Sequence, residues 1–248
     1  MSLVTELLVL ILNLFISPTW AACTDPPGKN VFWIECDFSG IDLSGKDLRH
    51  AVLTKTNLSN ANLSGANLMG AELGDTNLHQ ANLTKANLSN ARLVGSDLTE
   101  ANFTDANLKG ARLDRANMRK VVMRSAKMEG ARLYNSILTE ASMEKSNLSG
   151  ANLEQANLNN AKLSSANLTE AVLNDASLEG AILKGTDLEK AKLRRCFMAN
   201  TDLRQANLTR ADLVDADLTN AQLDGAILAN TIWPDSKRCK PSSVGECR

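Results

Sequence analysis

The 248-residue sequence has few of the residues from which catalytic and metal sites are usually built. It contains two histidines, His50 and His79, and five cysteines. Catalysis needs acid, base or nucleophilic groups that converge within hydrogen-bond reach. Zinc sites need closely spaced cysteine and histidine ligands, and no such spacing is present. We therefore expect neither an enzyme nor a metal or other cofactor.

An excess of charge of one sign is also missing. The chain carries 27 basic and 28 acidic residues, a formal net charge of -1. Proteins that bind nucleic acid usually show a basic electrostatic footprint, so we expect no nucleic-acid partner. The same balance argues against a strongly acidic mimic of DNA.

What the sequence does contain is a strong five-residue period. In the stretch ANLSGANLMGAELGDTNLHQANLTKANLSNARL, residues 61–93, an apolar residue returns at every fifth position. Five residues of α-helix leave a net rotation of about 140°, so these leucines would share no helical face. In a continuous strand they would alternate between faces. A short extended piece followed by a two-residue corner satisfies the period, with Ala61 and Leu63 inward, Asn62 outward, and Ser64 and Gly65 at the corner.

This period is unbroken over residues 36–235, which divide into 40 consecutive units. The centre of every unit is apolar, and 32 of the 40 centres are leucine. Two residues before the centre, 27 of the 40 positions are alanine. A small residue beside a large one suits a narrow interior that is packed layer on layer. Met118, Met123 and Met128 are consecutive centres, which favours a core role over a metal site for these three residues.

Units such as ANLSG, ADLTN and ANLTK resemble the pentapeptide-repeat family. The resemblance implies an all-β fold, a right-handed, four-sided β-helix solenoid of about ten coils with four pentapeptides per coil. The residues themselves also indicate a period of 20. At the small position, six of the ten residues in one column are not alanine, against seven of thirty in the other columns. The six are Cys36, Thr56, Thr76, Ser96, Ser136 and Cys196.

The segments outside the repeat give the chain four parts. Residues 1–22 read as a signal peptide, since the run LLVLILNLFISPTWAAC is apolar and is too short to span a bilayer comfortably. A lipid-anchored Cys23 and an uncleaved apolar leader are the alternatives. Residues 23–35 form an N-terminal cap, 36–235 the β-helix, and 236–248 a C-terminal disulfide cap. We expect an exported protein, periplasmic or secreted, with no transmembrane helix.

Four cysteines flank the two caps. Cys23 and Cys36 enclose one non-repeat segment, and Cys239 and Cys247 enclose the other, so each pair would staple one end. The tail WPDSKRCKPSSVGEC resembles the terminal caps of exported members of the family. Five cysteines permit other pairings, and all five thiols could also be free. Cys196 falls at an inward position and is expected to be an inert buried thiol.

An open β-helix end exposes unpaired backbone groups and the core, so each end needs a lid. The expected lids are Phe32 with Trp33 at the first coil and Trp233 with Pro234 at the last. The alternative is that Trp33 or Trp233 anchors a partner.

One outward feature stands apart from the repeat. Arg92, Arg112 and Arg132 are spaced by 20 residues and would form a column with rungs about 4.8 Å apart. Residues 106–135 contain eight basic and two acidic residues. Like charges this close repel unless they are solvated or paired. The column is therefore either solvated surface or a possible site for an anion or an acidic partner.

These observations favour a non-enzymatic, exported structural or protein-binding scaffold that presents flat β-helix faces. The alternative is a module that binds anions or acidic polymers through Arg92, Arg112 and Arg132. A more distant alternative is a gyrase-interacting DNA mimic, a role that would require retention in the cytoplasm. The expected partner is a protein or an envelope polymer, and the sequence does not specify the oligomeric state.

The inward and outward assignment predicts the effect of two adjacent substitutions. Leu168→Asp should prevent folding or lower the melting temperature sharply, because it buries an unpaired charge that costs several kcal/mol. Asn167→Asp should be tolerated, because position 167 faces solvent. Circular dichroism and thermal melts of both variants measure the difference, and equal losses would contradict the assignment.

Overall fold

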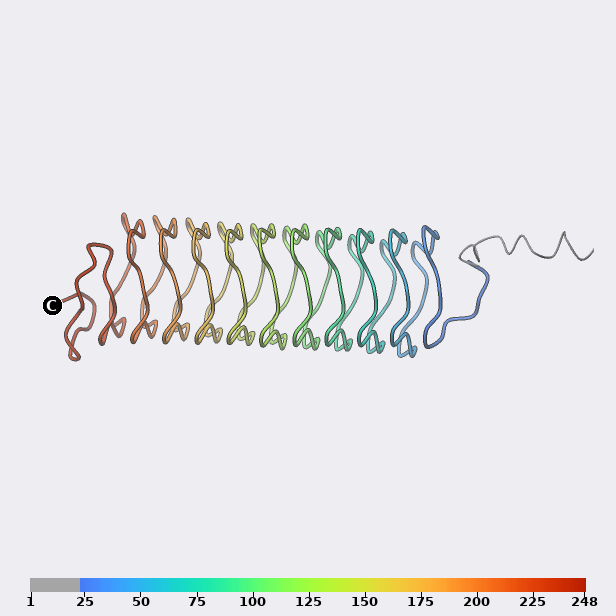
Figure 1. The fold of residues 1–248 in the computed structure, drawn as a ribbon, viewed down its shortest axis with the longest axis horizontal. Helices are drawn as coiled ribbons and strands as arrows, with labels where there is room; N and C mark the ends of the chain where they lie inside the picture. The colour runs from blue at the N-terminus through green and yellow to red at the C-terminus, as the bar shows by residue number, and fades with distance from the viewer. Residues whose placement is uncertain (1–22) are drawn as a thin grey trace, which may run out of the picture.

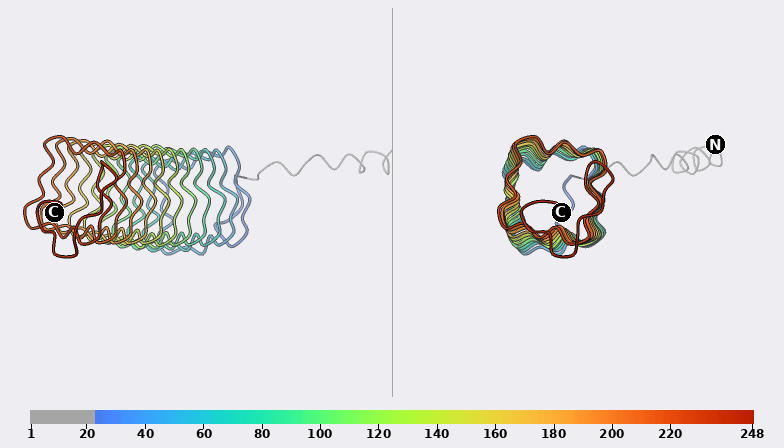
Figure 2. Two further views of the ribbon diagram at one scale, coloured as in Figure 1. Left: turned by 60° about the vertical axis from the view of Figure 1, so that its left-hand side comes forward. Right: turned by 90° about the vertical axis from the view of Figure 1, so that its left-hand side faces the viewer.

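The computed structural model describes residues 23–248, which form one elongated rod (Figure 1). The chain winds around the long axis from the blue N-terminal end to the red C-terminal end (Figure 1). Viewed along the axis, the coils superimpose in an outline with four corners (Figure 2). The rod is a right-handed β-helix, as the family resemblance implies.

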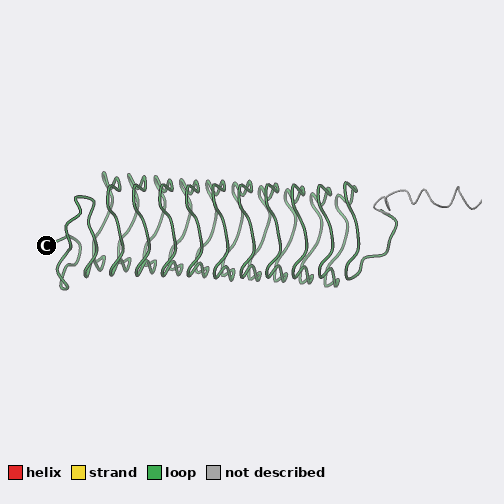
Figure 3. Ribbon diagram, in the orientation of Figure 1, coloured by secondary structure: helices red, strands yellow, loops and turns green. Residues whose placement is uncertain are grey.

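No helix and no strand longer than a single bridging residue occurs in residues 23–248, and Figure 3 accordingly draws this part of the chain as loop. Within the coils, pairing takes place through single-residue parallel bridges, each between residues 20 positions apart. The bridges run from Phe32↔Val52 to Asp212↔Ile232. Each five-residue unit has one residue between corners that forms such a bridge. Because bridged residues are 20 apart, one coil contains four units.

The backbone hydrogen bonds of each unit follow one scheme, shown by the unit 61–65. The first N–H bonds to the third carbonyl of the preceding unit, and the second N–H bonds to the first carbonyl one coil earlier. The third and fifth N–H groups bond to the second and fourth carbonyls one coil later. The four distances lie between 2.7 and 3.1 Å. Four of the five N–H groups are therefore paired by backbone alone.

The corners depend on the fifth residue of each unit, which has a positive φ from residue 30 to residue 230. At Lys85 φ is 58°, and at Arg195 it is 54°. Positive φ at the third of four turn residues is the pattern of a type II turn. For residues other than glycine this conformation costs about 1 to 2 kcal/mol. The coil retains it because the fifth N–H is bonded to the next coil and the residue that follows is buried, as Ala86 is after Lys85.

The fourth N–H of a unit is bonded by the side chain of the second residue. Asn62 Oδ1 accepts the N–H of Ser64 at 3.2 Å. The same side chain joins its neighbours along the rod, because Asn82 Nδ2 donates to Asn62 Oδ1 at 3.3 Å. We call such stacked Asn and Asp residues amide columns. Where the second residue is Asp42, the N–H of Ser44 lowers the pKa of its carboxyl group.

The core contains the residues that the five-residue period predicts. The inward leucines and alanines of the internal coils are almost fully buried, and Leu168 is 1% exposed. Met123 and Phe103 are also buried in this core. The column of small polar residues has a structural reason, since Thr76 Oγ1 donates to Leu53 O at 2.7 Å and Ser96 Oγ to Leu73 O at 2.6 Å.

The coiled ladder begins one unit earlier than Cys36. Phe32 pairs with Val52, and Trp33 fills the centre of the unit 31–35 with 1% exposure. Phe32 is 43% exposed and points outward, so the expectation that it lids the first coil is wrong. The alternation of Val31, Phe32 and Trp33 follows the repeat in geometry but lacks its alanine and leucine. Trp33 Nε1 donates to Asp25 O at 3.2 Å, which ties the preceding segment across the end.

The corner bond predicts a measurable contribution from a single amide. Asn82→Ala removes the acceptor for the Thr84 N–H and the donor to Asn62, so the free energy of unfolding should fall by about 1 to 2 kcal/mol. Lys162→Ala is the matched control on the same face, because residue 162 faces outward in the same column without an amide group. Chemical denaturation of both variants measures the effect. An equal loss in the control would show that the amide column does not stabilise the coil.

Candidate functional site

One face of the rod departs from the amide columns. On the other three faces, 20 of the 30 outward second positions from residue 37 to 227 are Asn or Asp, whereas on this face only two of eleven are. We call it the variable face. Its outward residues are Phe32, Val52, Glu72, Arg92, Arg112, Arg132, Asn152, Val172, Lys192, Asp212 and Ile232.

Most positions on the variable face give up the corner bond from their own side chain. Asn152 and Asp212 retain it, with the N–H of Glu154 at 2.9 Å and of Val214 at 3.2 Å. The other nine side chains have no amide or short carboxylate to accept this N–H. Each of these positions lacks a corner hydrogen bond worth about 1 kcal/mol. The residue type on this face is therefore not set by the corner bond, which is expected where a surface has a role other than stability.

The three arginines predicted as a site are neighbours on the variable face. Arg112 bridges to Arg92 on one side and to Arg132 on the other, so the column exists as the spacing predicts. Arg92 Nε lies 3.2 Å from Glu72 Oε2. The side chains of Glu72 and Arg92 are about half exposed, so this pair contributes little to stability.

The other two arginines share one buried carboxylate. Asp114 is 7% exposed, and its oxygens lie 3.7 Å from Arg112 Nε and 3.5 Å from Arg132 Nε. Arg112 Nε and Asp114 Oδ1 are buried without a hydrogen bond among the described residues. Asp114 therefore acts as a counter-ion for two guanidinium groups. The sequence did not reveal this role, because residue 114 occupies a corner position two residues from the column.

The basic segment 106–135 does not gather on one face. It spans more than one full coil, so its cations lie on every side of the rod. Arg124 is paired with Glu144 at 3.2 Å, whereas five cations of this segment make no ion pair within residues 23–248. These five are Lys109, Arg115, Arg119, Lys120 and Lys127.

A shallow depression lies at one edge of the variable face, beside Arg92. Two corner glycines, Gly74 and Gly95, line it together with Arg115, which has no ionic partner among the described residues. Glu72 and Asp75 also line it. A Cβ at Gly95 would approach Asp75 Oδ1 to 2.6 Å, so the carboxylate lies directly over this glycine. The depression thus offers both charge signs to a polar group.

The two histidines do not come together. His50 lies at a corner of the first coil against Gly70, and His79 lies 29 residues further along, at a corner of the third coil. No group of three or more potential metal ligands occurs within residues 23–248. The same part of the chain contains no helix with the length and hydrophobicity that a membrane span requires.

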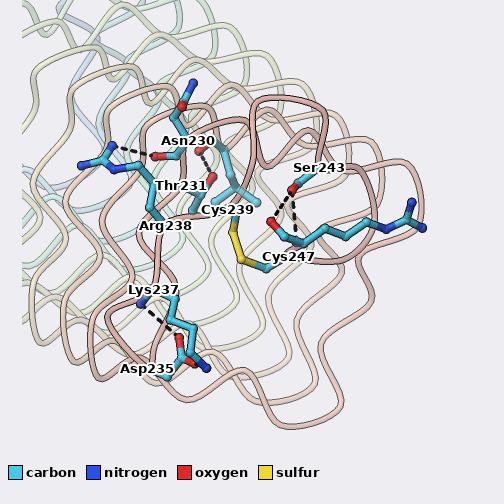
Figure 4. The surroundings of a disulfide bond; sticks show 10 residues. Asn230, Thr231, Asp235, Lys237, Arg238, Cys239, Ser243 and Cys247 are labelled. Atoms are coloured by element: carbon cyan, nitrogen blue, oxygen red, sulfur yellow. Dashed lines mark hydrogen bonds and ion pairs between the residues drawn. A yellow bond between two sulfur atoms is a disulfide. The ribbon is translucent and has the colours of Figure 1, made fainter.

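Both predicted cysteine pairs are bonded in the structure. Cys23 joins Cys36 across a separation of 13 residues, and Cys239 joins Cys247 across 8. Figure 4 shows the second disulfide within the tail, where the N–H of Cys239 donates to Thr231 O at 2.9 Å. Each bond holds a non-repeat segment against one end of the rod. The predicted signal peptide lies outside the described residues.

Cys196 is predicted to be chemically inert in the folded protein. It is 1% exposed, and burial raises the pKa of its thiol to about 12. A thiol reacts as the thiolate, so Ellman's reagent at pH 8 should detect no thiol in the native protein and one in denaturant without reductant. Cys196→Ala should remove the signal in denaturant. Rapid labelling of the native protein at Cys196 would contradict the buried assignment.

Comparison with known proteins places these features in a family. The family model described as pentapeptide repeats matches at residues 34–70, 61–99, 101–139, 136–175, 161–198, 171–210 and 198–232. No curated protein sequence matches the chain.

Solved structures of similar proteins include HetL from the cyanobacterium Nostoc sp. strain PCC 7120, a pentapeptide repeat protein involved in heterocyst differentiation regulation. It is 30% identical, with a TM-score of 0.51 and coverage of 81% of this chain and 92% of HetL. QnrB1, a plasmid-mediated fluoroquinolone resistance protein, is 21% identical, with a TM-score of 0.32 and coverage of 78% and 89%.

A pentapeptide repeat protein from the thylakoid lumen of Arabidopsis thaliana is 26% identical, with a TM-score of 0.21 and coverage of 46% of this chain and 66% of that protein. Neither this protein nor QnrB1 supports an argument about function, because both TM-scores are low. The family match and the likeness to HetL are sufficient for one conclusion. The chain belongs to the pentapeptide repeat family.

Proposed function

We propose that this protein is a non-enzymatic, exported scaffold that binds a partner protein through its variable face. The observation that carries the proposal is the contrast between this face and the other three. On three faces most outward second positions carry the Asn or Asp residues of the amide columns, which bond the corner N–H, whereas on the variable face most do not. Local rules for stability are most often set aside where a surface has another task.

The rod suits this task because its four-sided cross-section holds the outward side chains in fixed columns. Neighbouring residues such as Arg92 and Arg112 are locked by backbone pairing. A rigid face loses little conformational entropy when a partner docks, which favours binding. Apolar residues such as Val52 and Val172 lie on the same face as the charged residues, as in a protein interface with a mixed surface.

The exported location rests on two features. Two disulfides hold the ends, and disulfides persist in oxidising compartments. The apolar segment within residues 1–22 has the composition of a signal peptide. A cytoplasmic gyrase-interacting role is disfavoured by both features and by the net charge of -1.

A second candidate is an anion-binding module centred on the arginine column. It is favoured by Arg115, which lies beside Arg92 at the edge of the variable face and has no ion pair within residues 23–248. Carboxylates of the same chain reduce the net charge of the column, since Glu72 pairs with Arg92, and Asp114 pairs with Arg112 and Arg132. An acidic polymer would have to compete with these carboxylates, which makes the protein partner the better-supported candidate.

Charge removal on one face tests the proposal. The triple variant Arg92→Gln, Arg112→Gln, Arg132→Gln should reduce capture of the partner from envelope extract by about tenfold or more, because complementary charges at an interface contribute to affinity. Glutamine is used because glutamate would leave the buried Asp114 among like charges. The matched control is Lys85→Gln, Lys145→Gln, Lys162→Gln, which removes three cations from another face and its corner with the next.

Quantitative mass spectrometry of the captured proteins measures the effect. Equal capture by both triple variants and the parent would contradict binding through the variable face. Selective loss of retention on polyphosphate, with protein capture unchanged, would instead favour the anion-binding module.

A further inference from the structure

The C-terminal end of the rod is only half covered by the tail. Val244 pairs antiparallel with Ile227, and Arg238 pairs antiparallel with Ile232. The N–H of Leu228 donates to Ser243 O at 2.9 Å. The tail thus occupies the place of a further coil over two of the four faces, and the chain ends over the middle of the opening (Figure 2). This rung accepts added backbone, as the tail itself demonstrates.

The other half of the last coil, units 216–220 and 221–225, has no such cover. Within residues 23–248, the N–H groups of Leu218, Asn220, Leu223 and Gly225 have no hydrogen-bond acceptor. The equivalent N–H groups of the internal coils are bonded to the next coil. The carbonyls of Ala216 and Ala221, which in internal coils accept a bond from the next coil, are likewise unpaired in this part of the chain.

Apolar side chains of the core are uncovered at the same half coil. Leu218, Ala221 and Leu223 are partly exposed, whereas their counterparts one coil earlier are buried. A pocket opens between Leu223, Trp233 and the tail, and Lys237 and Glu246 form part of its rim. Figure 4 shows Lys237 and the Cys239–Cys247 disulfide on the tail that borders this opening. Leu223 and Trp233 provide apolar contact for one inserted side chain, and Asp235 also lines the pocket.

We propose that this half coil and its pocket bind an extended segment of a partner protein, which adds as a further rung. The four N–H groups and two carbonyls would bond to the backbone of the segment, and the pocket would hold one side chain about the size of leucine. The segment would place small residues over Ala216 and Ala221. Asp215, Asp217 and Asp224 surround the site and favour a basic residue on the outer side. This inference does not depend on the variable face.

A second copy of the chain fits this edge poorly. Continuation of the coil by another rod would require all four faces, and the tail already fills two of them. At the N-terminal end the outward residues of the matching faces are Asp37 and Asp42, and the first of these would meet Asp217. Charged residues at a sheet edge oppose this kind of association. A separate extended segment meets neither obstacle.

A peptide with the sequence of residues 81–90, ANLTKANLSN, acetylated and amidated, serves as the probe. It supplies alanine, leucine and lysine at the required positions. Saturating peptide should slow hydrogen exchange of the Leu218, Asn220, Leu223 and Gly225 amides by about tenfold or more, as nuclear magnetic resonance of the labelled full protein will show. Amides of the internal coils should not change.

Two controls make the test specific. The same peptide N-methylated at its two second-position asparagines cannot donate to Ala216 O or Ala221 O, and should give no protection. Leu223→Glu should abolish protection, whereas Ile182→Glu, an exposed position two coils earlier on the same face, should retain it. The proposal is overturned if both peptides protect equally or neither does. It is also overturned if the four amides are already protected in a dimer of the free protein, which would assign the edge to a second copy.

Discussion

Backbone pairing between residues 20 apart is the interaction on which the rest of the structure depends. Each coil supplies donors and acceptors for the next, so in the internal coils every N–H except the fourth of a unit is bonded without help from a side chain. Buried backbone groups must be paired, and a five-residue unit has no helix or strand to pair them within itself. This pairing requires the positive φ of the fifth residue and the small first residue, because they let the chain turn a corner while it stays paired with the adjacent coils.

This dependence also explains where function can reside. Inward positions are fixed by packing, and most outward second positions on three faces are fixed by the corner bond. The positions that remain free are the outward residues of the variable face and the unpaired groups at the end of the last coil. Both proposed sites lie where the repeat stops constraining the side chain or the backbone. A rigid solenoid therefore separates its stabilising residues from those available for binding.

Much of the fold was predictable from sequence because the period is local and strict. Leu168 and its counterparts are inward, the Arg92, Arg112 and Arg132 column is contiguous, and the four cap cysteines pair as expected. The start of the ladder was not predicted, because Val31, Phe32 and Trp33 keep the geometry of the repeat while changing its residues. The counter-ion role of Asp114 was missed for another reason, since it depends on two arginines from adjacent coils.

Native-state hydrogen exchange across the internal coils tests the central account most directly. If pairing between residues 20 apart holds the rod together, protection should recur with a period of five. The first, second, third and fifth amides of each unit should be slow, and the fourth should be fastest, especially on the variable face where fewer side chains accept its N–H. Uniform protection over runs of ten or more residues, or a period of two, would contradict this account.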